Sequence, residues 1–238
     1  MTEKNASSTR RAWWILILPP LLFLVLTILA SLAIGFAVRG DPEQIESGTT
    51  AAVPYILLFT QLLMALLLWR FTKADGLAFA DIGWRLREGQ KPLTEILIAI
   101  GVAIPLMLVN QFALLPITEW LQINVGDYVP PGAVGETLGA AAVVTAISAV
   151  ILAPFVEESL YRGYATRRLR EKLGPVAAFL IVMVFFALLH WAQGVWSMLY
   201  TMVAHAIFAG LALWRGNLYA AWMTHLLFNG VELALLFL

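Results

Sequence analysis

The sequence contains no cysteine and few charged residues. It can therefore form no disulfide, and it offers no thiolate as nucleophile or metal ligand. Only 13% of its 238 residues are charged and 61% are hydrophobic, whereas about a quarter of the residues in soluble domains are charged. The 15 basic and 15 acidic residues balance, so no excess of positive charge indicates nucleic-acid binding. A soluble core of this size could not cover so much apolar surface, and the composition favours lipid as the solvent.

Uncharged stretches mark the expected membrane spans, and they are Ala12–Val38, Ser47–Trp69, Ile96–Thr118, Thr137–Val156, Leu173–Trp214 and Gly216–Val231. The first has 27 residues, too many for the apolar core of a cleaved signal peptide, which has about 7–15. The fifth has 42 residues, about twice the ~20 needed for one crossing, and should fold back near Gln193-Gly194. The sequence thus predicts an all-α, polytopic membrane bundle of about seven transmembrane helices, within a range of six to eight.

Lys and Arg alternate between the expected loops. Three lie before the first span, five lie between Arg70 and Lys91, five lie between Arg162 and Lys172, and Arg215 stands alone in a short turn. The 117–136 connection has none. Because cytoplasmic loops carry the excess of positive charge, we expect a cytoplasmic N-terminus in a multi-pass protein of the cell membrane. The brevity of the chain suggests a bacterial inner membrane.

An ionisable residue inside a span is expensive and indicates function by default. The first such cluster is Glu157-Glu158-Ser159-Leu160-Tyr161-Arg162. Glu158 and Arg162 are four residues apart, with the acid first, which is the better order for an ion pair on a helix. Glu157 points about 100° away and has no partner in its own helix, so it is a candidate general base or acid. The alternative is that these charges only cap the inner end of the helix at the headgroups.

Two further clusters contain histidine. Phe186 and His190 are one helical turn apart on one face, as are His225 and Asn229. An imidazole beside a carboxamide could hold an oxyanion through hydrogen bonds. The alternatives are a structural histidine in the first case and hydrogen bonding between helices in the second. The third histidine, His205, matches no motif, and we expect it to bond between helices.

The three clusters can reach one depth in the membrane. If the fourth and fifth helices turn at Gly174-Pro175, Glu157 lies 17 residues before the turn and His190 lies 16 residues after it. Both are then about 25 Å from the turn. His190 would lie close to the next turn at Gly194, so either that turn dips into the protein or the expected helix ends are misplaced.

The ordered motifs Glu-Glu-x-x-x-Arg at 157–162, Phe-x-x-x-His at 186–190 and His-x-x-x-Asn at 225–229 resemble the CPBP family. These are the CAAX-prenyl-protease and bacteriocin-processing membrane proteins, also called the Abi or type II CAAX endopeptidase group. Asp81-Ile82-Gly83-Trp84-Arg85 is similar to a loosely kept feature of the family. The resemblance covers roughly residues 80–238 and shows no departure at the polar positions of the motifs.

The resemblance implies a glutamate-dependent intramembrane endopeptidase. Glu157 would activate the attacking water, His190 would position or deprotonate it, and His225 with Asn229 would stabilise the oxyanion. Glu158, Arg162 and Phe186 would support these catalytic residues. Peptide hydrolysis independently requires a base, an oxyanion donor and a proton for the leaving amine. No cofactor is expected. The sequence has no His-Glu-x-x-His motif, so no metal site is expected either, although Glu157, His190 and His225 are suitable metal ligands in type.

Other functions remain open at this point. The same fold could serve as a non-catalytic scaffold or immunity protein, as a metal-dependent variant of the protease, or as a small transporter whose buried Glu and His relay protons. We expect one membrane domain, with residues 1–75 as N-terminal tail and first two spans and residues 80–238 as catalytic core. The expected partners are a peptide or membrane-protein substrate and the lipid bilayer, and no nucleic acid.

Overall fold

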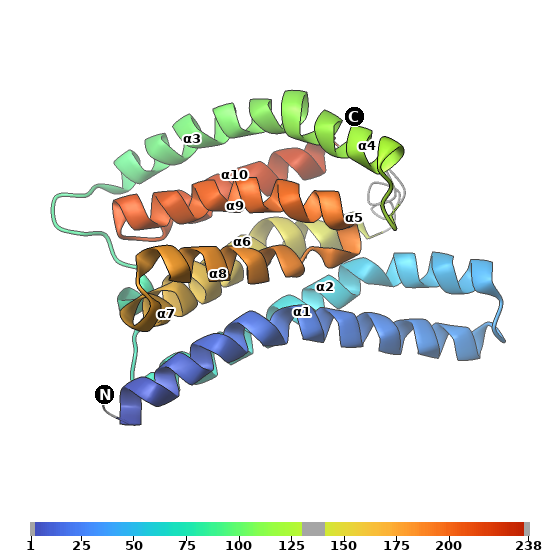
Figure 1. The fold of residues 1–238 in the computed structure, drawn as a ribbon, viewed down its shortest axis with the longest axis horizontal. Helices are drawn as coiled ribbons and strands as arrows, with labels where there is room; N and C mark the ends of the chain where they lie inside the picture. The colour runs from blue at the N-terminus through green and yellow to red at the C-terminus, as the bar shows by residue number, and fades with distance from the viewer. Residues whose placement is uncertain (1–2, 130–140, 236–238) are drawn as a thin grey trace.

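The computed structural model describes residues 3–129 and 141–235, and these residues form seven long helical segments and no strand. Figure 1 shows them packed side by side as a bundle. The segments are α1 (Glu3–Ala37), α2 (Pro42–Asp75), α3–η2–α4 (Pro92–Val109, Asn110–Leu114, Leu115–Asn124), α5–η4–α6–η5–α7 (Ala142–Thr145, Ala146–Leu152, Ala153–Glu157, Glu158–Ala165, Thr166–Leu173), α8 (Pro175–Leu188), α9 (Val195–Arg215) and α10 (Tyr219–Leu235). The structure confirms the polytopic helical bundle and its expected turns at Gly174-Pro175 and Gln193-Gly194.

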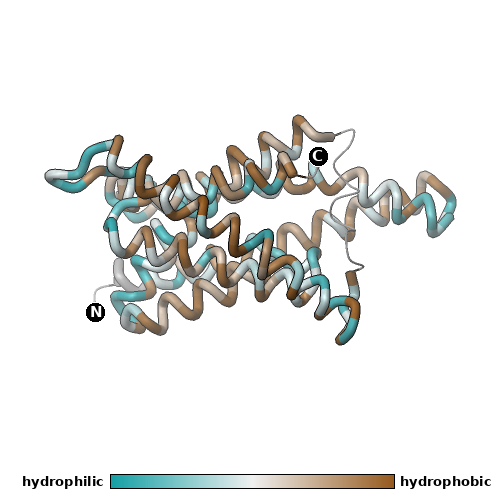
Figure 2. Tube along the Cα trace, turned by 90° about the horizontal axis from the view of Figure 1, so that it is seen from above, coloured by the Kyte–Doolittle hydropathy of each residue, from teal (hydrophilic) through white to brown (hydrophobic). Residues whose placement is uncertain are grey.

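Five of the seven segments are long and apolar enough to cross a membrane, and α8 is a shorter apolar helix. The positively charged segments gather at one end of the bundle (Figure 1), where the N-terminus, the 76–91 segment, the α7–α8 turn and the α9–α10 turn lie together. Figure 2 shows hydrophilic residues at the two ends of the bundle and long hydrophobic stretches between them. The positive-inside rule predicts that the end that carries the N-terminus faces the cytoplasm. We call it the inner end.

The turn after α8 lies well inside the length of the bundle. α8 has 14 residues, which span about 21 Å, less than the ~30 Å hydrocarbon core. The Trp191 ring in the short helix η6 (Trp191–Gln193) packs against Phe23 at 6.1 Å between ring centroids. Phe23 lies 14 residues before the outer end of α1 at Ala37, about 21 Å along the helix. The turn therefore dips into the protein, which is one of the two outcomes that the position of His190 allowed.

Three π-helical stretches interrupt the long segments. They are η2, η4 and η5, and the last two lie on either side of the short α6 helix that ends at Glu157. A π turn bonds each N–H to the carbonyl five residues back, so the residues that follow are rotated relative to a regular α-helix. Such stretches occur frequently at functional sites. Here they determine which way the residues from Glu157 to Arg162 point.

The 76–91 segment docks on the inner half of the bundle. It contains the short helix η1 (Phe79–Ile82), and a Cβ added at Gly163 would lie 2.6 Å from the Ile82 carbonyl oxygen. Only glycine permits so close an approach. The Trp84 indole N–H donates to Ser159 Oγ at 2.9 Å, and its ring packs on Phe155. The sequence segment around Trp84 thus braces the stretch that carries Glu157 and Glu158.

Candidate active site

The structure brings the three sequence motifs together in the middle of the bundle. The His225 ring centroid lies 4.8 Å from that of His205, which lies 3.8 Å from Phe186 and 5.8 Å from His190. Glu158 connects the first motif to this group, because its Oε1 lies 3.1 Å from His225 Nδ1. The predicted convergence of helices 142–173, α8 and α10 is therefore observed, and α9 contributes His205 at its centre.

Glu157 and Glu158 face different partners. Glu158 pairs with Arg162 at 3.4 Å, as its i,i+4 spacing predicts, and with His225. Glu157 has no partner in its own helix and accepts a hydrogen bond of 2.8 Å from the Gln61 side-chain amide on α2. Both carboxylates and Gln61 are buried. The resemblance implies that Glu157 is the base. Its carboxylate is thus held by a residue of α2, a helix that carries none of the three motifs.

Gln61 was missed because nothing in its spacing marks it. The only signal in the sequence is a carboxamide inside the uncharged Ser47–Trp69 stretch, where a polar side chain needs a partner. Its Oε1 has no hydrogen-bond partner among the described residues, and neither does Glu158 Oε2 or the Tyr161 hydroxyl. Buried polar groups are rarely left unsatisfied. Such atoms around Glu157 and Glu158 mark a place where water or the polar backbone of a substrate can bind.

The partners of the three histidines define which ring nitrogen carries the proton. His190 Nδ1 lies 3.3 Å from the Phe186 carbonyl oxygen, which can only accept. His190 therefore donates through Nδ1, and its Nε2 keeps a lone pair that can take a proton from water. Arg162 Nη2 lies 2.8 Å from His205 Nδ1, and a guanidinium can only donate. His205 accordingly accepts at Nδ1 and carries its proton on Nε2.

His225 and Asn229 do not bond to each other although they share a face of α10. His225 donates through Nδ1 to Glu158, so its Nε2 can donate to an oxyanion only when the ring is doubly protonated. Asn229 donates to the Ala149 carbonyl oxygen in the π stretch η4 at 2.8 Å, and its amide nitrogen keeps a second hydrogen. The Glu158–His225 pair resembles the acid–histidine pairs that balance an imidazolium during catalysis.

His205 lies at the centre of the site instead of at a remote helix contact. The expected bond between helices is confirmed, because Arg162 on η5 bonds to His205 on α9. The His205 ring also contacts Phe186, and the Arg162 guanidinium lies 4.6 Å from the centroid of the same Phe186 ring. Phe186 thereby positions both groups, and its place beside His190 is the one predicted from the Phe-x-x-x-His spacing.

The metal ligands considered from the sequence are not the residues that the structure groups. The side chains whose ligand atoms lie within 4.8 Å of one another are those of Glu158, His205 and His225. The Arg162 guanidinium already faces His205 Nδ1 at 2.8 Å and Glu158 Oε1 at 3.4 Å. A metal ion held by these three groups would have to displace that cation. The donor set therefore fits the guanidinium better than it fits a metal.

Another carboxylate, that of the half-buried Glu232, lies further along α10. Glu232 accepts hydrogen bonds from Asn110 Nδ2, at 2.8 Å, and from the Tyr200 hydroxyl. Asn110 begins the π stretch η2 and Tyr200 belongs to α9. The three residues tie α10 to its two neighbours, a role typical of polar side chains between transmembrane helices.

Comparison with protein families identifies the class of this bundle. The family model described as type II CAAX prenyl endopeptidase Rce1-like matches residues 139–231. No curated protein and no solved structure matches the chain. The matched region contains all three polar motifs, and the match confirms the resemblance to the CPBP family over that region. Over these residues the chain is similar to a family whose members are generally proteases.

Proposed function

We propose that the chain is an intramembrane endopeptidase that hydrolyses a peptide bond of a membrane-embedded or membrane-proximal substrate. The observation that carries the proposal is the grouping of Glu158, His190, His205 and His225, beside Glu157 and its partner Gln61, in a site that keeps several unsatisfied polar atoms. A bilayer excludes water, so an enzyme that hydrolyses peptides there must itself bind the water that reacts. The family match supports the proposal, because it covers residues 139–231, which contain the three motifs.

In the proposed reaction, Glu157 takes a proton from a bound water as the water oxygen attacks the scissile carbonyl carbon. Gln61 holds the carboxylate through Nε2 and offers its free Oε1 to the same water. His190, with an unprotonated Nε2, is the second acceptor that orients or deprotonates this water. General-base activation of this kind typically contributes about 10²–10⁴-fold to the rate.

The tetrahedral oxyanion would be stabilised by donors from the other side of the site. His225, when doubly protonated beside Glu158, and the second amide hydrogen of Asn229 are the proposed donors. The C–N bond then breaks as the proton held by Glu157 passes to the leaving nitrogen, which gives a carboxylate and an amine. Removing a single oxyanion donor typically lowers kcat by about 10²–10³-fold.

A reconstitution experiment tests this function. Purified protein in lipid vesicles is given a library of quenched fluorescent peptides that includes transmembrane segments and prenylated C-terminal tails. Cleavage by the wild type and its loss in Glu157→Gln and His190→Ala, with helicity intact, would support the proposal. Unchanged cleavage in both variants would refute it.

The scaffold or immunity alternative predicts a different result. A partner membrane protein that copurifies equally with wild type and Glu157→Gln, and a cellular phenotype that survives this substitution, would favour binding over hydrolysis.

We also propose that the protein is located in a bacterial inner membrane.

A further inference from the structure

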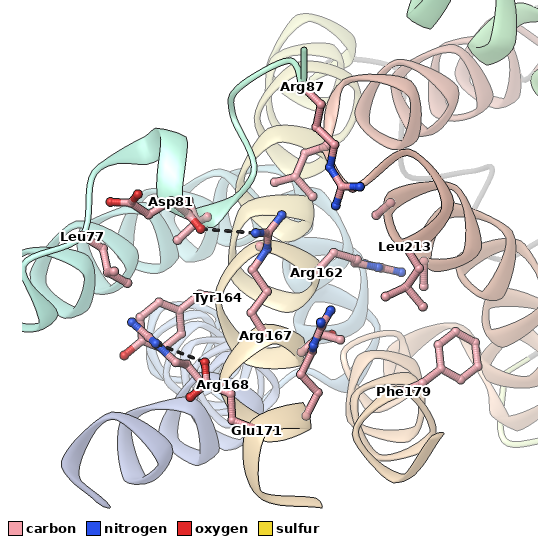
Figure 3. Close-up of a pocket in the computed structure, with 18 residues that line it drawn as sticks. Leu77, Asp81, Arg87, Arg162, Tyr164, Arg167, Arg168, Glu171, Phe179 and Leu213 are labelled. Atoms are coloured by element: carbon pink, nitrogen blue, oxygen red, sulfur yellow. Dashed lines mark hydrogen bonds and ion pairs between the residues drawn. The ribbon is translucent and has the colours of Figure 1, made fainter. Parts of the chain in front are cut away.

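A cavity of about 350 Å³ opens at the inner end of the bundle, and Arg162 is the one residue of the three motifs that lines it. It is bordered by α7, α8 and α9, by the 76–91 segment and by the α9–α10 turn. In Figure 3 the Arg87, Arg162 and Arg167 side chains reach into the same space from different elements. Arg162 lies at the buried end of this cavity, and the other arginines lie toward its mouth.

The positive charges around the cavity exceed the negative ones. Five arginines and two acidic residues line it, namely Arg87, Arg162, Arg167, Arg168, Arg170, Asp81 and Glu171. Glu171 forms an ion pair with Arg168. The Asp81 carboxylate accepts a hydrogen bond from the Ala78 N–H and thereby caps η1. Within 3–129 and 141–235, no carboxylate pairs with Arg87, Arg167 or Arg170.

Like charges brought together without a counter-charge destabilise the fold unless an anion joins them. The guanidinium groups of Arg170 and Arg87 repel that of Arg167, which donates a hydrogen bond of 3.3 Å to the Asp81 carbonyl oxygen. Guanidinium groups are the preferred protein ligands of phosphate, because their N–H donors match its oxygens. The electrostatics of the cavity therefore favour a phosphate-bearing anion.

Most of the other lining residues are apolar, and they indicate the source of the phosphate. Phe179 of α8 and Leu213 of α9 line the cavity (Figure 3), as does Ala209, one turn before Leu213 on α9. The arginines lie at the helix ends, the level of the lipid headgroups, and the apolar residues lie on helices that cross the hydrocarbon. We propose that this cavity binds an anionic phospholipid, with its phosphate among the arginines and an acyl chain along α8 and α9.

Binding in neutral detergent tests the site without the surface potential of a membrane. The wild type is compared with Arg87→Gln/Arg170→Gln, which removes two exposed arginines at the cavity mouth. The matched control is Arg70→Gln/Arg85→Gln, which removes two exposed charges of the same end that do not line the cavity. Native mass spectrometry counts retained phosphatidylglycerol and phosphatidylcholine, and thermal unfolding confirms that each variant is folded.

We expect phosphatidylglycerol to bind the wild type and the control alike. It should bind the cavity variant about 30-fold more weakly, since each of the two arginines contributes about 1 kcal/mol and 1.4 kcal/mol is tenfold. The proposal would be overturned if all three proteins retained phosphatidylglycerol equally. It would also be overturned if the wild type retained phosphatidylcholine as well as it retains phosphatidylglycerol. Inorganic phosphate is the competing ligand. If it displaces phosphatidylglycerol at equal concentration, the cavity is a free-anion site and the lipid assignment is wrong.

Discussion

Gln61 Nε2 lies 2.8 Å from Glu157 Oε1, across 96 residues of chain. The contact joins α2, which lies outside the matched family region, to the carboxylate that carries the proposed reaction. A buried carboxylate with a single amide partner keeps its second oxygen available for water. The N-terminal helices are therefore connected to the active site in addition to anchoring the bundle in the membrane.

Replacing Gln61 by leucine should impair the reaction and leave the fold intact. The substitution keeps the approximate shape and removes the hydrogen bond to Glu157, which at about 1.5–3 kcal/mol for a charged partner corresponds to roughly 10–100-fold in kcat/KM. The measurement is peptide cleavage in vesicles alongside thermal unfolding.

Thr60→Val is the matched control for this variant. Thr60 is buried on the same helix and bonds only to the Ile56 carbonyl of its own turn. It should keep nearly full activity. Full activity in Gln61→Leu would show that the contact is structural and that Glu157 is oriented by other groups.

Asp75 ties the N-terminal helices to the core and should dominate stability at the inner end. Its buried carboxylate accepts from Ser8, from Arg11 and from Tyr164, the last at 2.6 Å. Asp75→Asn removes the buried negative charge that Ser8, Arg11 and Tyr164 bind and should lower the free energy of unfolding by about 3 kcal/mol. For a chain of this size the melting temperature falls by about 6–12 °C.

Glu171→Gln is the comparison for this prediction, because Glu171 is an exposed partner of Arg168. It should change stability by less than about 1 kcal/mol. If the two variants melt at the same temperature in neutral detergent, the Asp75 cluster does not hold the helices together.

Gly163→Ala should separate the 76–91 segment from the bundle. The new Cβ would lie 2.6 Å from the Ile82 carbonyl oxygen, so the backbone must shift at an expense of about 1–3 kcal/mol. Gly101→Ala adds a Cβ to α3 with no atom within 4 Å and should be neutral or slightly stabilising. Proteolysis of the 76–91 segment is the measurement, and equal protection in both variants would contradict the close packing.

The outer end carries a pH-dependent tether. Asp127 is partly desolvated, which raises its pKa, but hydrogen bonds from the Val195 and Trp196 N–H groups outweigh this and hold the pKa below its usual value. A folded-state pKa below the unfolded one means that the stabilisation is present above the unfolded pKa and is lost as pH falls through the folded pKa. Wild type should melt about 2–4 °C above Asp127→Asn near neutral pH, and the difference should vanish in strong acid. A constant difference across that range would exclude the carboxylate as its cause.

Much of the fold follows from the sequence because the bilayer imposes simple rules. The uncharged runs mark the helices, and the 42-residue run Leu173–Trp214 is two helices because one crossing needs about half that length. Glycine and proline at 174–175 end α7 and begin α8 as expected. The i,i+4 pair Glu158–Arg162 forms as expected because its two residues are local.

The parts of the site that escaped prediction depend on long-range partners and on irregular helix geometry. Gln61 and His205 belong to helices without a motif, and their importance comes from residues 96 and 43 positions away. The π stretch η4 supplies the Ala149 carbonyl that binds Asn229, and a 3.6-residue period gives no sign of it. The spacing of His225 and Asn229 placed them on one face correctly but could not show that each has a different partner.

The most direct test of the account compares new protein termini in membranes that contain the wild type or Glu157→Gln. Both proteins must be folded and present in equal amounts. The account predicts a set of termini in or beside membrane spans that appears with the wild type and is absent with Glu157→Gln. Identical termini in the two membranes would contradict the claim that Glu157 activates water for peptide hydrolysis.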